Sequence, residues 1–213
     1  MENHLTREKL IQKELPAPET LKIDKLHYYD PLIHGFYEQK AVLPDNRTRA
    51  FRIYIPDGGT VNIPVVFLAV PAGAETAEFL ISSGWKSIAD EDKVMLAAME
   101  PEGEWKSPEE ELPYLRAVRA EVSRKVYYAA FNSAYYLAGY EGGADAVQYA
   151  AMSAPHDWAG VVSFGGKGLP AETCAELAAA PSRAKGISNG EVALPAWIAA
   201  PELSEGLQNL IRH

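Results

Sequence analysis

A continuous apolar run constrains the fold of this chain more than any other feature of its sequence. From Ile63 to Val70 the residues read Ile-Pro-Val-Val-Phe-Leu-Ala-Val, without a charged or hydroxyl side chain. Such a run cannot present one polar face to water, so it is typical of a strand that is covered on both sides. A strand of this kind requires helices above and below its sheet, and the rest of the chain has to supply them.

Further apolar runs alternate with helical segments along the rest of the chain. The alternation predicts a mainly parallel sheet with helices on both faces. Strands are expected near Val65–Val70, Val94–Met99, Ala134–Ala138, Gly160–Phe164 and Leu194–Ala200. Helices are expected over Glu78–Asp90, with Phe79, Trp85, Ile88 and Ala89 facing inward, from Ser107 to about Lys125, over Gly142–Ser153 and over Leu203–Arg212. The stretch Gly165–Glu191, rich in Gly, Ala, Pro and Ser, is expected to cross the top of the sheet irregularly.

The beginning of the chain has a different pattern. Two segments of strand-forming residues, Gly35–Leu43 and Thr48–Ile55, flank the turn Pro44-Asp45-Asn46 and predict an antiparallel hairpin. Residues 1–33 carry mixed charges and three prolines, and we expect a leader with one helical turn before Leu15. The 213 residues then divide into this leader, 1–33, and one domain, 34–213.

Composition excludes several classes of function. With 20 Lys and Arg against 29 Asp and Glu, the net charge is −9, so neither nucleic acid nor an anionic membrane is an expected partner. The N-terminus has no apolar run of signal-peptide length, and no stretch is long enough to span a bilayer, which favours a soluble, cytoplasmic protein. The single cysteine, Cys174, allows neither an internal disulfide nor a multi-cysteine zinc site.

The most informative motif joins a predicted strand to a predicted helix. Residues 138–143 read Ala-Gly-Tyr-Glu-Gly-Gly, so Gly-x-Glu-x-Gly stands directly before the helix Gly142–Ser153. This context is that of a nucleophile elbow, in which glycines let strand and helix approach closely around a strained central residue. The central residue here is Glu141.

On these residues the chain resembles the α/β-hydrolases, in particular the branch of polyhydroxybutyrate depolymerases and feruloyl or acetylxylan esterases. The resemblance covers roughly residues 35 to 200. Supporting segments are Ser83-Gly84-Trp85 after the strand Val65–Val70, and Asp157-Trp158 after the elbow helix. It implies an α/β-hydrolase-like three-layer sandwich with a mainly parallel sheet, an N-terminal antiparallel hairpin and an incomplete C-terminal part.

The chain departs from this family at the catalytic positions. The resemblance implies an elbow serine, where this chain has Glu141, and a His-Gly loop, where it has Val70-Pro71-Ala72-Gly73. Pro71 has no N–H with which to stabilise an oxyanion. The acid position falls on Glu202, with Glu205 nearby, and the only later histidine is the last residue, His213. Oxyanion or ligand-binding positions carried over from the family are Gly142, Ala72, Gly73 and Tyr140.

Two interpretations of Glu141 remain open. It could be a carboxylate nucleophile, as in dehalogenases and epoxide hydrolases of the same fold, although that chemistry also needs a base. Alternatively, its carboxylate rests at the positive end of the following helix. His156 is expected on the surface far from the elbow, and His27 and His34 have no metal-binding spacing. We therefore expect no metal and no cofactor.

The sequence thus favours an esterase-like domain with a degenerate, incomplete triad, which is non-catalytic on its own and retained for binding or assembly. The alternative is an active hydrolase of carboxylic esters or related bonds that uses Glu141, or a histidine supplied by another chain. A third possibility is the first portion of a longer gene product. Expected partners are a second copy or a complementing chain at the C-terminal edge, Leu194–Ala200, and a small-molecule or ester ligand.

Overall fold

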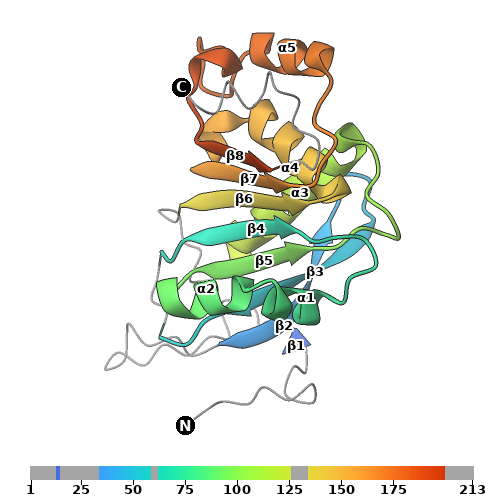
Figure 1. Ribbon diagram of the computed structural model, residues 1–213. Helices are drawn as coiled ribbons and strands as arrows, with labels where there is room; N and C mark the ends of the chain where they lie inside the picture. The colour runs from blue at the N-terminus through green and yellow to red at the C-terminus, as the bar shows by residue number, and fades with distance from the viewer. Residues whose placement is uncertain (1–12, 15–33, 59–61, 126–133, 200–213) are drawn as a thin grey trace.

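The strands form one sheet that runs through the molecule (Figure 1). The structure is a computed structural model, and it describes residues 13–14, 34–58, 62–125 and 134–199. The strand order is β1-β2-β3-β5-β4-β6-β7-β8, with β2 and β3 antiparallel and β5, β4, β6, β7 and β8 mutually parallel. The strands are β1 (Lys13–Glu14), β2 (Gly35–Val42), β3 (Thr48–Ile55), β4 (Val65–Ala69), β5 (Met95–Met99), β6 (Tyr135–Tyr140), β7 (Gly160–Phe164) and β8 (Ala196–Ala199).

Helices cover both faces of this sheet. On one face lie α1 (Thr76–Ser82) and α2 (Trp85–Asp92), and on the other α3 (Pro108–Lys125) and α4 (Gly142–Ser153) (Figure 1). The helix α5 (Ala171–Ala179) packs against α4, and two short 3₁₀ turns, η4 (Pro155–Asp157) and η5 (Asn189–Glu191), complete the described helices. None of the helices in the described part of the chain is long and apolar enough to cross a membrane.

Two hydrophobic cores hold the three layers together. The larger lies between the sheet and α3 and α4, and contains Phe51, Phe67 and Tyr114. The smaller lies between the sheet and α1 and α2, and contains Leu68 and Leu80. All five residues of β4 are buried, because each face of the strand contacts one of the two cores. The expected three-layer sandwich with an antiparallel start is therefore confirmed.

The predicted parallel strands are confirmed within one or two residues at their ends. The strand predicted at Ala134–Ala138 is β6, which continues to Tyr140 and lies in the interior of the sheet between β4 and β7. The predicted helix Gly142–Ser153 has the same bounds in the structure. The predicted helix from Ser107 begins at Pro108, where the Ser107 carbonyl accepts hydrogen bonds from the N–H groups of Glu110 and Glu111.

The single helix predicted over Glu78–Asp90 is wrong. The chain forms two helices, α1 and α2, because Gly84 adopts a φ of 84° and interrupts the helical path after Ser83. The change of direction also alters which side chains face inward. Ala89 is buried and Phe79 and Trp85 pack against the smaller core, as expected, but Ile88 is 44% exposed.

The two ends of the chain lie mostly beyond what the structure describes. Lys13 and Glu14, within the segment where a helical turn was expected, instead form β1 and pair in parallel with Tyr37 and Glu38 of β2. The rest of the predicted leader and the predicted helix Leu203–Arg212 lie outside the described residues. The predicted irregular excursion Gly165–Glu191 contains the helix α5 and the turn η5, so it is more regular than expected.

Candidate active site

The turn between β6 and α4 has the sharp geometry expected of an elbow. Glu141 lies between the two elements with φ 52° and ψ −124°. A residue with a Cβ rarely adopts positive φ, and such residues cluster at functional sites. The Glu141 N–H donates to the Phe164 carbonyl oxygen of β7 at 2.8 Å, and its carbonyl oxygen accepts from the Ala144 N–H at 3.0 Å. These two bonds hold the strained backbone, and the side chain is exposed.

The glycines around Glu141 are required by close contact between strand and helix. A Cβ on Gly139 would lie 2.5 Å from the Gly143 carbonyl oxygen and 2.7 Å from the Val147 side chain. A Cβ on Gly143 would lie 2.8 Å from the Cβ of Ala69 on β4. Neither position tolerates a side chain, which explains the glycine spacing that the sequence shows.

The Glu141 carboxylate does not cap the helix that follows it. Glu141 occupies the N-cap position of α4, but its side chain makes no capping hydrogen bond. The carboxylate instead lies in solvent, at the positive end of the helix. The N–H of Gly142, in the first turn, has no intrahelical partner and remains a donor beside it.

The loop after β4 borders the elbow, as expected from the strand order. Ala69 of β4 pairs with Gly139 of β6, so Val70 and the residues after it reach the same edge of the sheet as Glu141. Ala72 is half-buried and Gly73 is exposed with φ 73°. Pro71, which lacks an N–H, begins this loop.

Trp105 is a residue of the site that the sequence analysis missed. Its indole N–H donates to the Val70 carbonyl oxygen at 2.7 Å. A Cβ on Gly142 would lie 2.9 Å from the Trp105 Cβ, and one on Gly143 would lie 3.0 Å from its Nε1. The indole therefore packs between the β4 loop and the first turn of α4. The sequence did offer a signal for this residue, since Trp105 is a single tryptophan among charged residues shortly after a buried strand.

Tyr140, immediately before the elbow, belongs to an aromatic cluster. Its ring stacks on Phe164 with centroids 4.7 Å apart and contacts the edge of Phe79 at 5.0 Å. The Trp85 indole N–H donates to the Tyr140 hydroxyl at 2.9 Å. Burial raises the pKa of Tyr140, and the hydrogen bond from Trp85 opposes that rise. Tyr140 thus joins α1, α2 and β7 to the elbow.

Asp145 fixes the loop that follows β7. Its carboxylate accepts from the Gly168 N–H at 2.9 Å and from the Lys167 N–H at 3.3 Å. A Cβ on Gly166 would lie 2.5 Å from Asp145 Oδ1, so this loop passes close over the first turn of α4. The loop and the Trp105 segment together border the elbow.

The histidines of the described residues lie away from the elbow. His34 contacts Asp57 at 2.5 Å, just beyond the end of β3, and His156 lies in η4 after the end of α4. Both positions are at the amino ends of the parallel strands, whereas the elbow is at their carboxyl ends. Glu202, Glu205 and His213 lie outside the described residues, as does His27. In the described part of the chain no three of His, Cys, Asp and Glu gather as metal ligands would.

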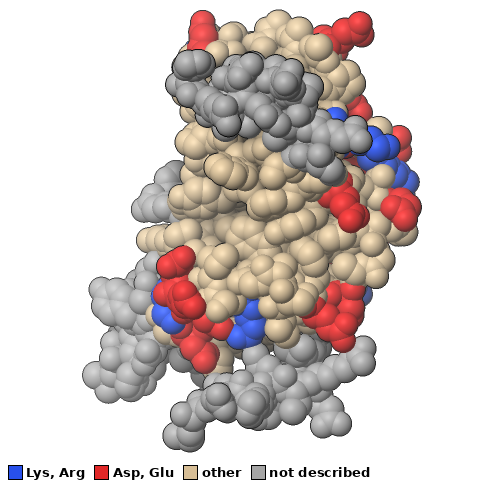
Figure 2. All heavy atoms as spheres, in the orientation of Figure 1, with Lys and Arg blue, Asp and Glu red and all other residues tan. Residues whose placement is uncertain are grey.

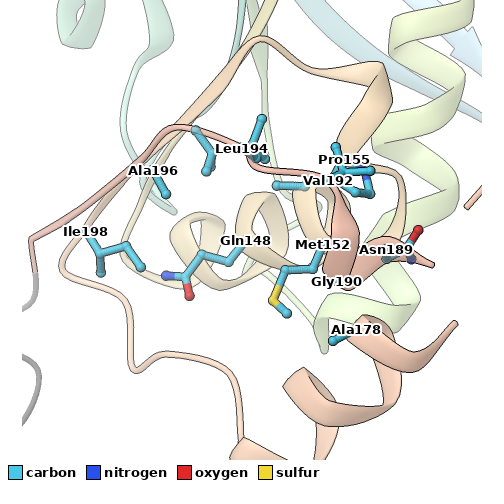
Figure 3. Close-up of a pocket in the computed structure, with 12 residues that line it drawn as sticks. Gln148, Met152, Pro155, Ala178, Asn189, Gly190, Val192, Leu194, Ala196 and Ile198 are labelled. Carbon is cyan, nitrogen blue, oxygen red and sulfur yellow. The ribbon is translucent and has the colours of Figure 1, made fainter. Parts of the chain in front are cut away.

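A separate apolar cavity of about 310 Å³ lies between α4, η5 and the segment that leads into β8 (Figure 3). Met152 and Gln148 of α4 face Leu194 and Ile198 across it, and Val192 closes one side. Gln148 is the largest polar side chain of the lining and makes no hydrogen bond to any described residue. The cavity has the size and the apolar lining of a small-molecule site.

Comparison with known proteins identifies the fold. No protein family and no curated protein matches this sequence. Among solved structures, the chain is similar to the poly(3-hydroxybutyrate) depolymerase LpqC of Bordetella parapertussis, at 18% identity and a TM-score of 0.52 over 70% of this chain and 64% of that one. It is also similar to FAE, at 13% identity and a TM-score of 0.50 over 87% of this chain and 72% of that one. A third similar structure is Est1E of Butyrivibrio proteoclasticus, at 12% identity and a TM-score of 0.50 over 61% of this chain and 51% of that one.

The chain therefore has an α/β-hydrolase fold, and the match with the depolymerase spans less than two thirds of that protein.

Proposed function

We propose that this chain is an esterase-like α/β-hydrolase domain with a degenerate catalytic triad, which does not hydrolyse esters on its own and serves in binding or assembly. The observation that carries the proposal is the strained elbow occupied by Glu141 in place of a hydroxyl nucleophile. A carboxylate at this point repels the negative charge that develops on the substrate oxygen during ester hydrolysis, so it opposes the reaction that the scaffold would otherwise support.

The surroundings of the elbow support the same conclusion. Ester hydrolysis needs a base to take the proton of the attacking group and backbone donors for the oxyanion. Neither described histidine lies near Glu141, Pro71 withholds a donor, and the Trp105 indole packs against Gly142. The N–H of Gly142, in the first turn of α4, remains a donor in the expected position.

The alternative is an active hydrolase in which Glu141 attacks carbon directly, or in which another chain supplies the histidine. A carboxylate nucleophile forms a covalent ester with the substrate, and a base must then activate water to release it. The exposure of Glu141 would allow a substrate or a second chain to reach it. This alternative therefore requires a base from outside the described residues.

The decisive experiment compares wild type, Glu141→Ser and Glu141→Gln on nitrophenyl acyl esters and on haloalkanes and epoxides. We expect no turnover above a denatured control for any of the three, because restoring the hydroxyl does not restore a base. Wild-type turnover that Glu141→Gln abolishes would make Glu141 a nucleophile and overturn the proposal. Strong ester turnover by Glu141→Ser would reveal a base near the elbow.

Assembly is favoured by the sheet surface at β8. In the described residues β8 has a neighbouring strand on one side only. Trp197 pairs with Val162 and so lies on the α1 and α2 face, where it is 62% exposed; Tyr136 of β6 is 39% exposed on the same face. Figure 2 shows a wide uncharged surface across the middle of this face, with charged side chains gathered at its lower end and one margin.

A second copy of the chain suits this surface. The segment Leu194–Ala199 carries no charge, so two copies can meet there without the repulsion expected from a net charge of −9. Two edge strands related by a two-fold axis would pair and bury both tryptophans. Sedimentation velocity should show concentration-dependent dimers that Trp197→Asp abolishes and that the control Ile187→Asp retains. A monomer at all concentrations would exclude this mode of assembly.

Binding is favoured by the cavity of Figure 3. Its apolar lining fits a small apolar molecule whose polar group could bond the free amide of Gln148. Fluorescence of anilinonaphthalene sulfonate should rise on mixing with the wild type, and Ala178→Trp, which fills the cavity, should suppress the rise. An equal rise for both proteins would place the dye elsewhere.

A further inference from the structure

A second cavity, lined by apolar side chains together with three arginines and an aspartate, lies at the end of the molecule opposite the elbow. It measures about 160 Å³ and is lined by α3, by the end of α4 and by Asp157, Trp158 and Arg183. The Ala159 N–H, next to Trp158, donates to the Tyr135 carbonyl oxygen at the start of β6, which places this cavity at the amino ends of the parallel strands. The 12 residues of α4 separate it from Glu141, a distance of about 18 Å along the helix.

Positive charge gathers at this cavity although the protein as a whole is acidic. Three guanidinium groups line it, from Arg116 and Arg119 of α3 and from Arg183 after α5, against the single carboxylate of Asp157. Arg116 makes no ion pair with any described residue. With His156 counted as neutral, three positive charges and one negative charge leave an excess of two positive charges.

Two of these arginines lie beside Asp157, but neither makes a short hydrogen bond to its carboxylate. Arg119 Nη2 lies 3.4 Å from Asp157 Oδ1, and Arg183 Nη1 lies 3.6 Å from Oδ2. His156 Nε2 lies 3.5 Å from Oδ1. These separations exceed the usual N–H···O range of about 2.7–3.2 Å, so both guanidinium groups keep donors that the carboxylate does not use.

Two buried donors beside this cavity also lack a partner. In the described structure the Nε of Arg119 and the indole nitrogen of Trp158 have no hydrogen-bond acceptor, and Trp158 is only 8% exposed. Buried polar groups are nearly always hydrogen-bonded, because an unpaired donor loses its bonds to water without replacement. The Arg119 guanidinium also lies over the Trp158 ring, 5.4 Å from its centroid, which keeps it beside the cavity.

We propose that this cavity binds a small oxyanion of the phosphate class, either inorganic phosphate or the phosphoryl group of a phosphomonoester. Phosphate carries about −1.5 to −2 charges at neutral pH, which matches the excess of two positive charges. The planar fork of arginine donates two parallel hydrogen bonds to phosphate oxygens. Inorganic phosphate and a phosphomonoester both present these oxygens and this charge. A monocarboxylate would neutralise only half of the excess.

Isothermal titration calorimetry of the full chain tests this site, with inorganic phosphate, phenyl phosphate and acetate as probes. We expect saturable phosphate binding that weakens as ionic strength rises. Arg183→Gln and Arg116→Gln, both exposed and harmless to the core, should each weaken it about tenfold or more, because each removes a charged hydrogen bond. Arg124→Gln, an exposed arginine of α3 that does not line the cavity, is the matched control and should bind as wild type does.

The outcomes distinguish inorganic phosphate from a phosphomonoester as the ligand, and they also test whether the cavity is the binding site. Tighter binding of phenyl phosphate than of inorganic phosphate would identify a monoester, and the reverse order would identify the free ion. Acetate binding as tightly as phosphate would overturn the assignment of a phosphate class. No saturable binding, or binding that Arg183→Gln and Arg116→Gln leave unchanged, would overturn the site itself. Circular dichroism of each variant verifies that the fold is retained.

Discussion

The indole N–H of Trp105 donates to the carbonyl oxygen of Val70 at 2.7 Å, and the same side chain packs against the first turn of α4. Trp105 thereby joins the loop after β4 to the elbow of β6 and α4. The nucleophile elbow of an α/β-hydrolase receives the substrate oxygen near these two segments, so this contact bears on the stability of the elbow and on the space around it.

Replacing Trp105 should separate the contribution of its ring packing to stability from that of its hydrogen bond to Val70. Trp105→Ala removes a half-buried ring and is expected to lower the free energy of unfolding by about 2–4 kcal/mol. Trp105→Phe keeps a ring but leaves the Val70 carbonyl without its donor, at a cost of about 1 kcal/mol. Urea denaturation measures both, with the exposed Trp197→Ala as control. Equal stability of Trp105→Ala and Trp197→Ala would contradict the packing described for Trp105.

Gly139 should tolerate no side chain. Gly139→Ala would place a Cβ 2.5 Å from a backbone oxygen of α4, and we expect a loss of about 3 kcal/mol or more, or failure to fold. Gly160→Ala on the neighbouring strand is the matched control, because its Cβ would meet the nearest atom at an ordinary 3.4 Å. Soluble yield and thermal unfolding of the two variants provide the measurement. Equal yield and equal thermal stability of Gly139→Ala and Gly160→Ala would contradict the close approach of β6 and α4.

Glu141 should be a site where glycine stabilises the fold. Glu141→Gly relieves the strain of a φ of 52°, and we expect a gain of about 0.5–1 kcal/mol after the entropy that glycine costs. Glu141→Ala retains a Cβ and should show no such gain. Thermal unfolding at neutral pH compares the two variants with wild type. A stability order with alanine above glycine would show that the elbow is unstrained.

The buried pair of Arg49 and Glu111 should be the most sensitive ion pair among the described residues. Arg49 Nη1 lies 2.7 Å from Glu111 Oε2, with the two side chains 7% and 1% exposed, and the guanidinium lies 3.6 Å from the centroid of the Tyr114 ring. Glu111→Ala leaves a buried cation unpaired and should cost about 3–5 kcal/mol. The exposed Glu110→Ala, one residue away, should change stability by less than about 0.5 kcal/mol. The midpoints of urea denaturation distinguish Glu111→Ala from Glu110→Ala.

A double replacement refines this prediction. Arg49→Met combined with Glu111→Leu removes both charges and should recover most of the loss, because no unpaired charge remains in the core. Failure to recover stability would mean that the packing of these side chains, rather than their charge, accounts for the effect.

Alkaline pH should destabilise the protein through its buried tyrosines. Burial raises the pKa of Tyr114, and burial together with its hydrogen bond to Asp90 raises the pKa of Tyr54. The unfolded chain loses these protons near pH 10 while the folded protein retains them, so the stability that each contributes is complete below about pH 10 and is lost as pH rises above it.

Tyr114→Phe tests this dependence. The variant loses the hydrogen bond from Tyr114 to the Ala50 carbonyl oxygen and should be less stable at neutral pH. Between about pH 9 and pH 11, however, its unfolding free energy should fall less steeply than that of wild type, since one proton fewer is released on unfolding. Parallel pH profiles for the two proteins would show that Tyr114 does not contribute.

Local patterns in the sequence were sufficient to identify the strands of the sheet from β2 to β8, but not β1. Runs such as Val65–Val70 have to be buried on both faces, and the glycines around Glu141 allow a close turn, so the strands, the helix Gly142–Ser153 and the elbow could be located without any long-range information. The break in the helix near Gly84 was missed, because a glycine can also be accommodated within a helix.

The contacts across the sheet were decided only by the tertiary structure. Trp105 and Val70 are 35 positions apart, and Arg119 and Arg183 are far apart in the chain, so no spacing or periodicity relates them. Val70 and Trp105 meet because the strands that they follow, β4 and β5, are neighbours in the sheet. The two arginines meet because α3 and the segment after α5 both lie beside Asp157. The identity of the side chains therefore determined which segments could be buried. The order of the strands determined which side chains share a site, because a parallel sheet brings together the ends of strands that are distant in the chain.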